Sequence, residues 1–245
     1  MKEAYKSLSL LEYNVFNDAL STINYRQKQL ITTINQYSYC IADNDFNFKK
    51  ALQQSDILLP DGVGIVIAAK VLKNKKIKKI AGADIHQFLL EKVNAASGSC
   101  MYLGSSENTL GKIKQRLSIE YPNIKVSVYS PPYKSEFSEE DNKMMVAAVN
   151  TVKPDVLFVG MTAPKQEKWS KDNAHQLDTK TICAIGAVFD FYAGTVKRPS
   201  QFWIRLKLEW FIRLLKEPKR MWRRYLYYGP FFLYLLLKVM LKRGK

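Results

Sequence analysis

Short runs of apolar and β-branched residues alternate with amphipathic stretches along most of this chain. The short runs predict strands, and the stretches with apolar residues three or four positions apart predict helices. The predicted strands are Gln29–Ile34, Ile57–Leu59, Ser99–Leu103, Lys125–Tyr129, Val156–Val159 and Thr181–Ile185. The predicted helices are Phe46–Gln54, Val63–Leu72, Ala83–Ala95, Thr109–Tyr121, Glu139–Val152 and Lys165–His175. Strands that alternate with helices indicate parallel βαβ units, so we expect an α/β fold with a doubly wound, mostly parallel sheet.

The pattern changes near residues 197–200, where this alternation stops. Beyond that point the sequence predicts three helical pieces, namely Trp203 to Glu217, a second that starts at Pro218, and a third separated from it by Gly229-Pro230. Proline suits the first turn of a helix better than its interior, which places the second start. We therefore predict a core over residues 1–196 and a helical appendage over residues 197–245.

The predicted appendage is strongly basic and rich in aromatic residues. It holds fourteen Lys and Arg against two acids, a net charge of +12, which leaves +4 of the whole-chain +16 for the rest. Basic residues interleaved with Trp, Tyr, Phe and Leu suit an anionic phospholipid surface. The apolar run from Pro230 to Leu241 is broken by Lys238 and is shorter than the ~20 residues of a spanning helix. We therefore expect a basic, amphipathic, membrane-binding segment that lies on the bilayer.

Two other interpretations of the appendage stay open at this point. The last helix could pack on the body of the protein, and a mixture of basic and aromatic residues is also compatible with nucleic acid. The continuously apolar end argues against a solvated nucleic-acid arm, so we expect no nucleic-acid partner.

The cysteine and histidine content limits the chemistry. Cys40, Cys100 and Cys183 are far apart and form no ligand spacing, which is typical of reduced thiols in a cytosolic protein. With two histidines the sequence cannot form a His-rich metal site. No basic-then-apolar signal peptide begins the sequence, so we expect the protein to stay where it is made.

Asp43-Asn44-Asp45 spells the D-x-D that metal-dependent sugar transferases use for Mg²⁺ or Mn²⁺. Here it stands at the start of an amphipathic helix instead of at the end of a strand. Helix capping explains both acids, so we expect no metal at this position.

Loops that follow the strands hold the candidate chemistry, because ligands of such sheets bind at the carboxyl ends of the strands. Asp61 and Gly62 follow one strand in a Gly-containing loop that opens a helix, where backbone N–H groups suit a phosphate or a sugar oxygen. Asp84 and Gly104 lie in two similar loops. Turn formation and helix capping are the structural alternatives for Asp61 and Asp84.

The string Ala163-Pro164-Lys165-Gln166-Glu167 follows another strand. Gln166 offers both a donor and an acceptor to a sugar, and Lys165 offers a cation to a phosphate. The alternative is that both are solvated residues of a first helical turn. Asp190 lies among aromatic residues after the last strand, where we expect it to bind backbone N–H groups.

Together these pieces resemble the WecG/TagA/CpsF family of glycosyltransferases, from about Leu30 to Arg224. The motifs that carry the resemblance are Thr33-Ile34-Asn35, Pro60-Asp61-Gly62-Val63-Gly64, Gly82-Ala83-Asp84, Ala163-Pro164-Lys165-Gln166-Glu167, Gly186 to Gly194 with Val196-Lys197-Arg198, and Leu208-Glu209-Trp210 through Arg213-Leu214 to Glu217-Pro218 and Arg220. They occur in family order with compatible spacing. Beyond Tyr228 the apolar extension is not part of the shared pattern.

The resemblance implies a Rossmann-like core and an inverting, metal-independent enzyme without a cofactor. Such enzymes move a sugar from a UDP-sugar donor to a polyprenyl-diphosphate-linked sugar acceptor at the cytoplasmic face of the membrane. Their products are teichoic-acid linkage units, enterobacterial common antigen or exopolysaccharides. Among the donors of the family we favour N-acetylmannosamine, with its uronic acid and glucose left open.

The resemblance also implies roles for individual residues. Asp61 would be the general base that deprotonates the acceptor hydroxyl, which an inverting displacement requires. Thr33 and Asn35 would line the donor-sugar pocket, and Gln166 would orient a sugar near the reacting carbon. Asp84 and the Gly104 loop would contact the nucleotide-sugar.

The basic appendage would supply the charge that a metal supplies elsewhere. Departing UDP develops negative charge, and Arg213, Arg220 and Arg223 are candidates to stabilise it because Arg pairs with phosphate bidentately. Pro218 bends this segment, so the choice between Arg223 and Arg224 stays open. We expect the appendage to dock over the pocket and exclude water, and truncation after Ser200 to leave a folded, inactive core.

Three other classes of protein remain as alternatives. A nucleic-acid binder would use the basic appendage alone. An NAD-type oxidoreductase would need a complete G-x-G-x-x-G, which the sequence lacks. A membrane scaffold without activity would not need Asp61, Asn35 and Gln166 together. The oligomeric state is open, and a homo-oligomer is compatible with the sequence.

Overall fold

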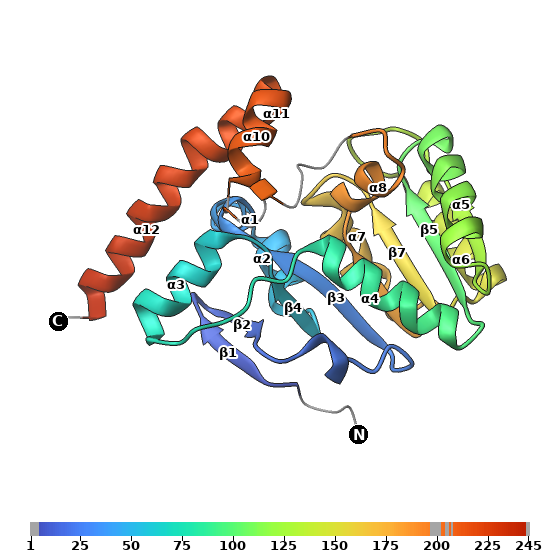
Figure 1. Cartoon of the computed structure of the whole chain (residues 1–245), viewed down its shortest axis with the longest axis horizontal. Coiled ribbons are helices and arrows are strands. Elements are labelled where there is room, and N and C mark those ends of the chain that lie inside the picture. The colour runs from blue at the N-terminus through green and yellow to red at the C-terminus, as the bar shows by residue number, and fades with distance from the viewer. Residues whose placement is uncertain (1–4, 197–201, 204–205, 207, 244–245) are drawn as a thin grey trace.

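The computed structural model describes residues 5–196, 202–203, 206 and 208–243. Its centre is an eight-stranded sheet in the order β1-β2-β4-β3-β8-β7-β5-β6 (Figure 1). The strands are β1 (Ser7–Leu10), β2 (Tyr13–Phe16), β3 (Gln29–Ile34), β4 (Ile57–Pro60), β5 (Ser99–Gly104), β6 (Lys125–Tyr129), β7 (Val156–Gly160) and β8 (Thr181–Ala184). Every neighbouring pair is parallel except β1 with β2. The predicted α/β fold with a mostly parallel sheet is therefore confirmed, and each of the six predicted strands is present.

The antiparallel hairpin of β1 and β2 is absent from the prediction. Its strands are four residues long, and the two residues between them, Leu11 and Glu12, have φ of 53° and 68°. A two-residue turn with positive φ at both positions normally carries Asn or Gly. Because Leu-Glu gives no such signal, the sequence pattern does not reveal the hairpin.

Helices cover both faces of the sheet (Figure 1). They are α1 (Gln36–Ala42), α2 (Phe46–Gln53), α3 (Val63–Lys73), α4 (Gly82–Ala95), α5 (Glu107–Glu120), α6 (Glu139–Val152), α7 (Lys165–Asn173) and α8 (Ala187–Tyr192), with a 3₁₀ turn at Leu20–Thr22. Helices α4, α5 and α8 pack on one face, whereas α1, α2, α3, α6 and α7 pack on the other. The six predicted helices are present, and α1 and α8, which are short, were not predicted.

Parallel pairing brings four strand ends to one edge of the sheet. Ile34 of β3 pairs with Pro60 of β4, and Val159 of β7 pairs with Ala184 of β8. The loops that follow these residues therefore start at the same edge, where a ligand is expected in open α/β sheets.

A buried pair of polar side chains lies inside the face that α4 covers. His86 of α4 and Tyr102 of β5 are hydrogen-bonded, with 2.6 Å between Nε2 and the hydroxyl oxygen. Burial lowers the pKa of His86 to about 3, so the ring is neutral at physiological pH. His86 is therefore a buried core residue of α4.

The C-terminal segment is mostly helical between Glu209 and Arg243. It consists of α10 (Glu209–Lys216), α11 (Pro218–Trp222), a π-helical turn (Arg223–Tyr227) and α12 (Tyr228–Arg243). The first predicted piece began at Trp203, and part of its beginning lies outside the described residues. The predicted separation at Gly229-Pro230 is wrong, because both residues belong to the first turn of α12. Pro230 fits there because the N–H groups of a first turn have no partner within the helix.

Helix α12 packs on the body through one face and leaves another uncovered. Phe232 and Leu236 are buried in a hydrophobic cluster with residues of α1, α2 and α3, and Figure 1 shows α12 running beside α1 and α3. Leu233, Leu237 and Leu241 are more than half exposed. Within the described residues, no helix combines the length and the apolar character needed to cross a membrane. The division at residue 196 stays a prediction.

Candidate active site

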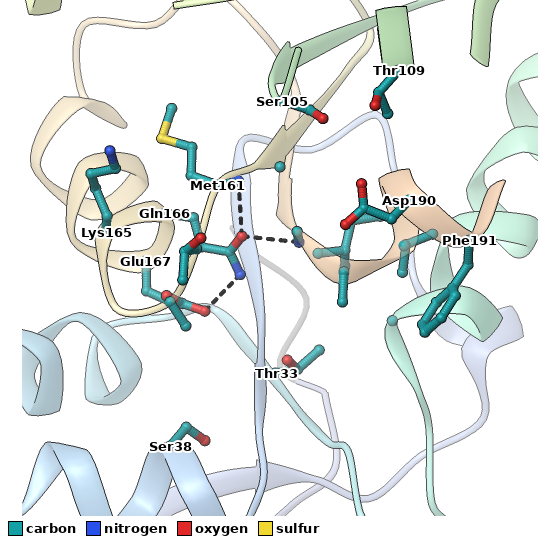
Figure 2. Close-up of a pocket in the computed structure, with 18 of the residues that line it drawn as sticks. Thr33, Ser38, Ser105, Thr109, Met161, Lys165, Gln166, Glu167, Asp190 and Phe191 are labelled. Carbon is teal, nitrogen blue, oxygen red and sulfur yellow. Dashed lines mark hydrogen bonds between the residues drawn. The ribbon is translucent and has the colours of Figure 1, made fainter. Parts of the chain in front are cut away.

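A cavity of about 1020 Å³ opens at the edge where the strands β3, β4, β7 and β8 end. The C-terminal segment contributes to its wall beside these loops. Its lining includes Thr33, Asn35, Ser38, Asp61, Ser105, Thr109, Met161, Lys165, Gln166, Glu167, Gly186, Asp190, Phe191, Arg213, Arg223 and Arg224. Figure 2 shows part of this lining, which comes from elements far apart in the sequence.

Asp61 and Asn35 meet at the ends of the paired strands β4 and β3. The backbone N–H of Asp61 donates to the carbonyl of Ile34 at 2.8 Å. Asn35 caps α1, because its Oδ1 accepts from the N–H groups of Tyr37 and Ser38, both at 3.0 Å. The Asn35 oxygen is therefore engaged by the backbone, whereas its amide nitrogen has no such bond among the described contacts. Asp61 lies in the cavity wall, as the sequence predicts.

Gln166 joins the loops after β7 and β8. Its Oε1 accepts from the backbone N–H of Met161 at 3.2 Å and from that of Gly186 at 2.9 Å. Its Nε2 donates to Oε1 of Glu167 at 2.8 Å. The dashed lines in Figure 2 mark these three bonds. The amide of Gln166 thus fixes the cavity wall, so the acceptor that we expected it to offer to a sugar is already occupied.

Glu167 is the last residue of the Ala163-Pro164-Lys165-Gln166-Glu167 motif, and no role was predicted for it. Its side chain lines the cavity although only 3% of the residue is exposed. Burial raises the pKa of its carboxyl to about 7, against smaller opposing effects that include the bond from Gln166 and the charge of Arg224. Within the described residues its Oε2 has no hydrogen-bond partner. An acid in the first turn of a helix is usually explained by the helix dipole, so the motif alone does not reveal that this carboxyl is buried.

Three arginines of the C-terminal segment line the cavity. Arg213 lies over the ring of Phe191 at 5.1 Å, and its buried Nε has no hydrogen-bond partner in the described part of the chain. Arg224 lies over the ring of Tyr37 at 4.7 Å. Burial lowers the pKa of Arg224, and the carboxylate of Asp61 is among the groups that oppose this.

The π-helical turn bears on the choice between Arg223 and Arg224. Both residues line the cavity, but Arg224 is half-buried whereas Arg223 is exposed and lies over the ring of Trp222 at 5.5 Å. We therefore assign the inner position to Arg224. The side chain of Arg220 lies outside the described residues.

Gly62, Asp84 and Gly104 do not appear in the lining. Asp84 caps α4, since its Oδ2 accepts from the N–H of Ala81 at 2.8 Å. Gly62 and Gly104 have φ of 126° and 117°, which only glycine adopts without strain. A Cβ on Gly104 would lie 2.3 Å from the carbonyl oxygen of Gly160. Gly62, Asp84 and Gly104 therefore determine the local backbone at the edge of the sheet. Ser105, which follows Gly104, does line the cavity, and contact of this loop with a nucleotide stays a prediction.

The side chains of Lys165 and Asp45 already have partners within the protein. Nζ of Lys165 donates to the carbonyl of Lys134 at 2.6 Å and lies over the ring of Phe137 at 4.3 Å. Asp45 caps α2 through the N–H of Phe48 at 3.0 Å and forms an ion pair with Lys168 at 2.5 Å. Among the residues that the structure describes, no group of three His, Cys, Asp or Glu side chains is arranged to hold a metal.

Comparison with known proteins agrees with the fold and the cavity. The model of the glycosyl transferase WecG/TagA/CpsF family matches residues 6–245. This chain belongs to that family. An N-acetylglucosaminyldiphosphoundecaprenol N-acetyl-beta-D-mannosaminyltransferase of Bacillus subtilis is 31% identical over 86% of this chain and 84% of its own length. Enzymes with the same name are similar in Bacillus spizizenii, at 31% identity over 73% of this chain and 67% of the relative, and in Staphylococcus aureus, at 26% over 88% and 82%.

The match to the family extends through α12, beyond the residues on which the resemblance was based. The expectation that the apolar extension after Tyr228 lies outside the shared pattern is therefore corrected. The resemblance itself is confirmed.

The buried carboxyl of Glu167 predicts a pH dependence of stability. Its pKa is about 7 when folded, against an ordinary value of 4.5, so the folded state binds more protons between these values. The stability that this group contributes is therefore full below pH 4.5 and is lost as the pH rises through about 7. We expect the free energy of unfolding of the wild type to fall relative to Glu167→Gln across this range, by on the order of 3 kcal/mol.

Urea unfolding of both proteins at several pH values between 4.5 and 8 measures this difference. If the free energies of unfolding of the two proteins changed equally with pH, the raised pKa of Glu167 would be contradicted.

Proposed function

We propose that this chain transfers a sugar, with inversion, from a UDP-sugar to a polyprenyl-diphosphate-linked GlcNAc-type acceptor. The favoured donor is UDP-N-acetylmannosamine, and the product would enter teichoic acid or exopolysaccharide synthesis. The observation that carries the proposal is that Asp61 and arginines of the C-terminal segment line the same cavity. The family match and the names of the relatives support the choice of substrates.

The reaction assigns Asp61 the role of general base. The acceptor hydroxyl oxygen attacks the anomeric carbon of the donor sugar while its proton passes to the Asp61 carboxylate. The bond from that carbon to the UDP oxygen breaks at the same time, on the opposite face of the sugar. A positioned carboxylate typically contributes ~10²- to 10⁴-fold to such a step.

The arginines stabilise the leaving group. UDP departs with increased negative charge on its diphosphate, and Arg213 and Arg224 present guanidinium groups to the same cavity. Their partly buried positions strengthen the interaction, because a charge is less screened away from water. We propose that these cations take the place of a metal and that no other cofactor is needed.

The uncovered side of the C-terminal segment is proposed to lie on the cytoplasmic face of the membrane. The segment carries a net charge of +12 from residue 197 onward. Its exposed apolar side chains are Phe202, Trp203, Leu206, Trp210, Phe211, Leu215, Trp222, Leu226, Tyr227, Leu233, Tyr234, Leu237, Met240 and Leu241. Such a combination favours an anionic bilayer surface and brings the cavity to a lipid-linked acceptor.

A second donor class stays open. UDP-glucose or a UDP-hexuronic acid would use the same general base and the same leaving group. A panel of donors therefore belongs in the test of activity.

Mass spectrometry of the lipid product tests the reaction. The purified full chain is mixed with each UDP-sugar and a short-prenyl diphosphate-GlcNAc, with EDTA and without added metal. We expect a product one sugar heavier, and Asp61→Asn should lower its rate by ~10²-fold or more. Asp172→Asn, on an exposed surface, is the matched control and should leave the rate unchanged. The proposal would be contradicted if no donor gave product even after membranes were added to the mixture. Full activity of Asp61→Asn would also contradict it.

Sedimentation with lipid vesicles tests the membrane surface. We expect the full chain to pellet with phosphatidylglycerol vesicles more than with phosphatidylcholine vesicles, and less at high salt. Leu237→Glu should weaken binding because it places a charge on the exposed face of α12. Ile119→Glu, on exposed α5, is the matched control. Equal binding of both vesicle types, or equal effects of both substitutions, would contradict the proposal that this segment binds an anionic membrane. Retention on RNA instead would favour the nucleic-acid alternative.

A further inference from the structure

Glu167 has a carboxyl oxygen to which the described part of the fold gives no partner. Glu167 is 3% exposed and lines the cavity, yet its Oε2 is buried without a hydrogen bond in the described part of the chain. Leaving such a group unsatisfied costs about 1–3 kcal/mol. Buried polar groups without partners are uncommon and point to a bound water, an ion or a ligand.

Maintaining the cavity wall does not require this second oxygen. Oε1 of Glu167 already accepts from Nε2 of Gln166, and the other end of that amide holds the N–H groups of Met161 and Gly186. A glutamine at position 167 could keep the same bond through its carbonyl oxygen. The structural role therefore explains one oxygen of the carboxyl and leaves the other without a function.

Glu167 lies on the side of the cavity where the sugar of a UDP-sugar donor is expected. Helix α7, which carries Glu167, contacts strand β3, which carries Thr33. In Figure 2, Glu167 and Gln166 lie on one side of the view and Ser105 and Thr109 lie on the other. The loop of Ser105 is where a nucleotide is expected, whereas Thr33 and Asp61 mark the place of the reacting sugar.

We propose that Glu167 is a specificity-determining residue whose Oε2 accepts a hydrogen bond from a hydroxyl group of the transferred sugar. This assignment rests on the proposed function. Oε1 keeps Gln166 in place, so the same carboxyl couples the wall of the cavity to the sugar. A hydroxyl is the suitable partner because it donates one directional hydrogen bond and adds no charge to a cavity that already contains Asp61 and Arg224.

Binding of UDP-sugar compared with UDP tests this role. Isothermal titration calorimetry gives Kd values for both ligands with the wild type and with Glu167→Gln, using the donor that gives product or, if none does, UDP-N-acetylmannosamine. The variant keeps an acceptor for Gln166 and places an NH₂ group where Oε2 stood. We expect its Kd for the UDP-sugar to rise by about tenfold or more, while its Kd for UDP changes less than about twofold.

Controls separate this role from damage to the fold. Glu139→Gln, at the exposed start of α6, is the matched control and should bind both ligands as the wild type does. Glu167→Asp is the second variant, for use if Glu167→Gln does not fold. It keeps the carboxylate but withdraws it by one methylene, so we expect the same selective loss for the UDP-sugar.

Each outcome either supports or overturns the assignment. A folded variant that changes the Kd of UDP-sugar and of UDP by the same factor, or changes neither, overturns it. If those variants also transfer sugar at the wild-type rate, the proposed function stands and only the role of Glu167 fails. If the wild type gives no product and binds UDP-sugar no differently from UDP, the proposed function fails together with the inference.

Discussion

The parallel pairing of the central strands is the constraint on which the rest of the structure depends. Because β3 pairs in parallel with both β4 and β8, and β8 with β7, their carboxyl ends reach one edge of the sheet. Asp61 and Gln166 are separated by about a hundred residues of sequence, yet they line one cavity. Gln166 then links the loops after β7 and β8 by accepting two backbone N–H groups.

The C-terminal segment adds Arg213, Arg223 and Arg224 to the wall of the cavity. Burial of Phe232 and Leu236 fixes α12 against α1 and α3, and Cys40 of α1 lies in the same cluster. This packing brings Arg224 over the ring of Tyr37, which neighbours the cap of α1. Truncation after Ser200 would expose this cluster to water. Whether the remaining core folds stays a prediction. Single substitutions of the arginines test their effect on sugar transfer without removing the packing of α12 on the core.

The sequence predicts the parts of the structure that have strong local signals. Alternating apolar runs identify the central strands, and the loop residues Asp61 and Gln166 follow from the rule that ligands bind at strand ends. Contacts between residues far apart in the sequence cannot be predicted from these local signals. Neither the burial of Glu167 beside Gln166 nor the inner position of Arg224 after a π-helical turn can be inferred from spacing alone. Asp84 shows the converse, because its sequence context suits a ligand whereas its carboxylate caps a helix.

We propose above that an arginine of the C-terminal segment stabilises the leaving UDP in this cavity. The initial rate of sugar transfer by Arg224→Gln, compared with the wild type at saturating donor, tests it most directly. We expect Arg224→Gln to lose about 100-fold in rate with an unchanged melting temperature, while Arg26→Gln, on an exposed loop, stays at the wild-type rate. Transfer by folded Arg224→Gln at the wild-type rate would show that Arg224 does not stabilise the leaving UDP.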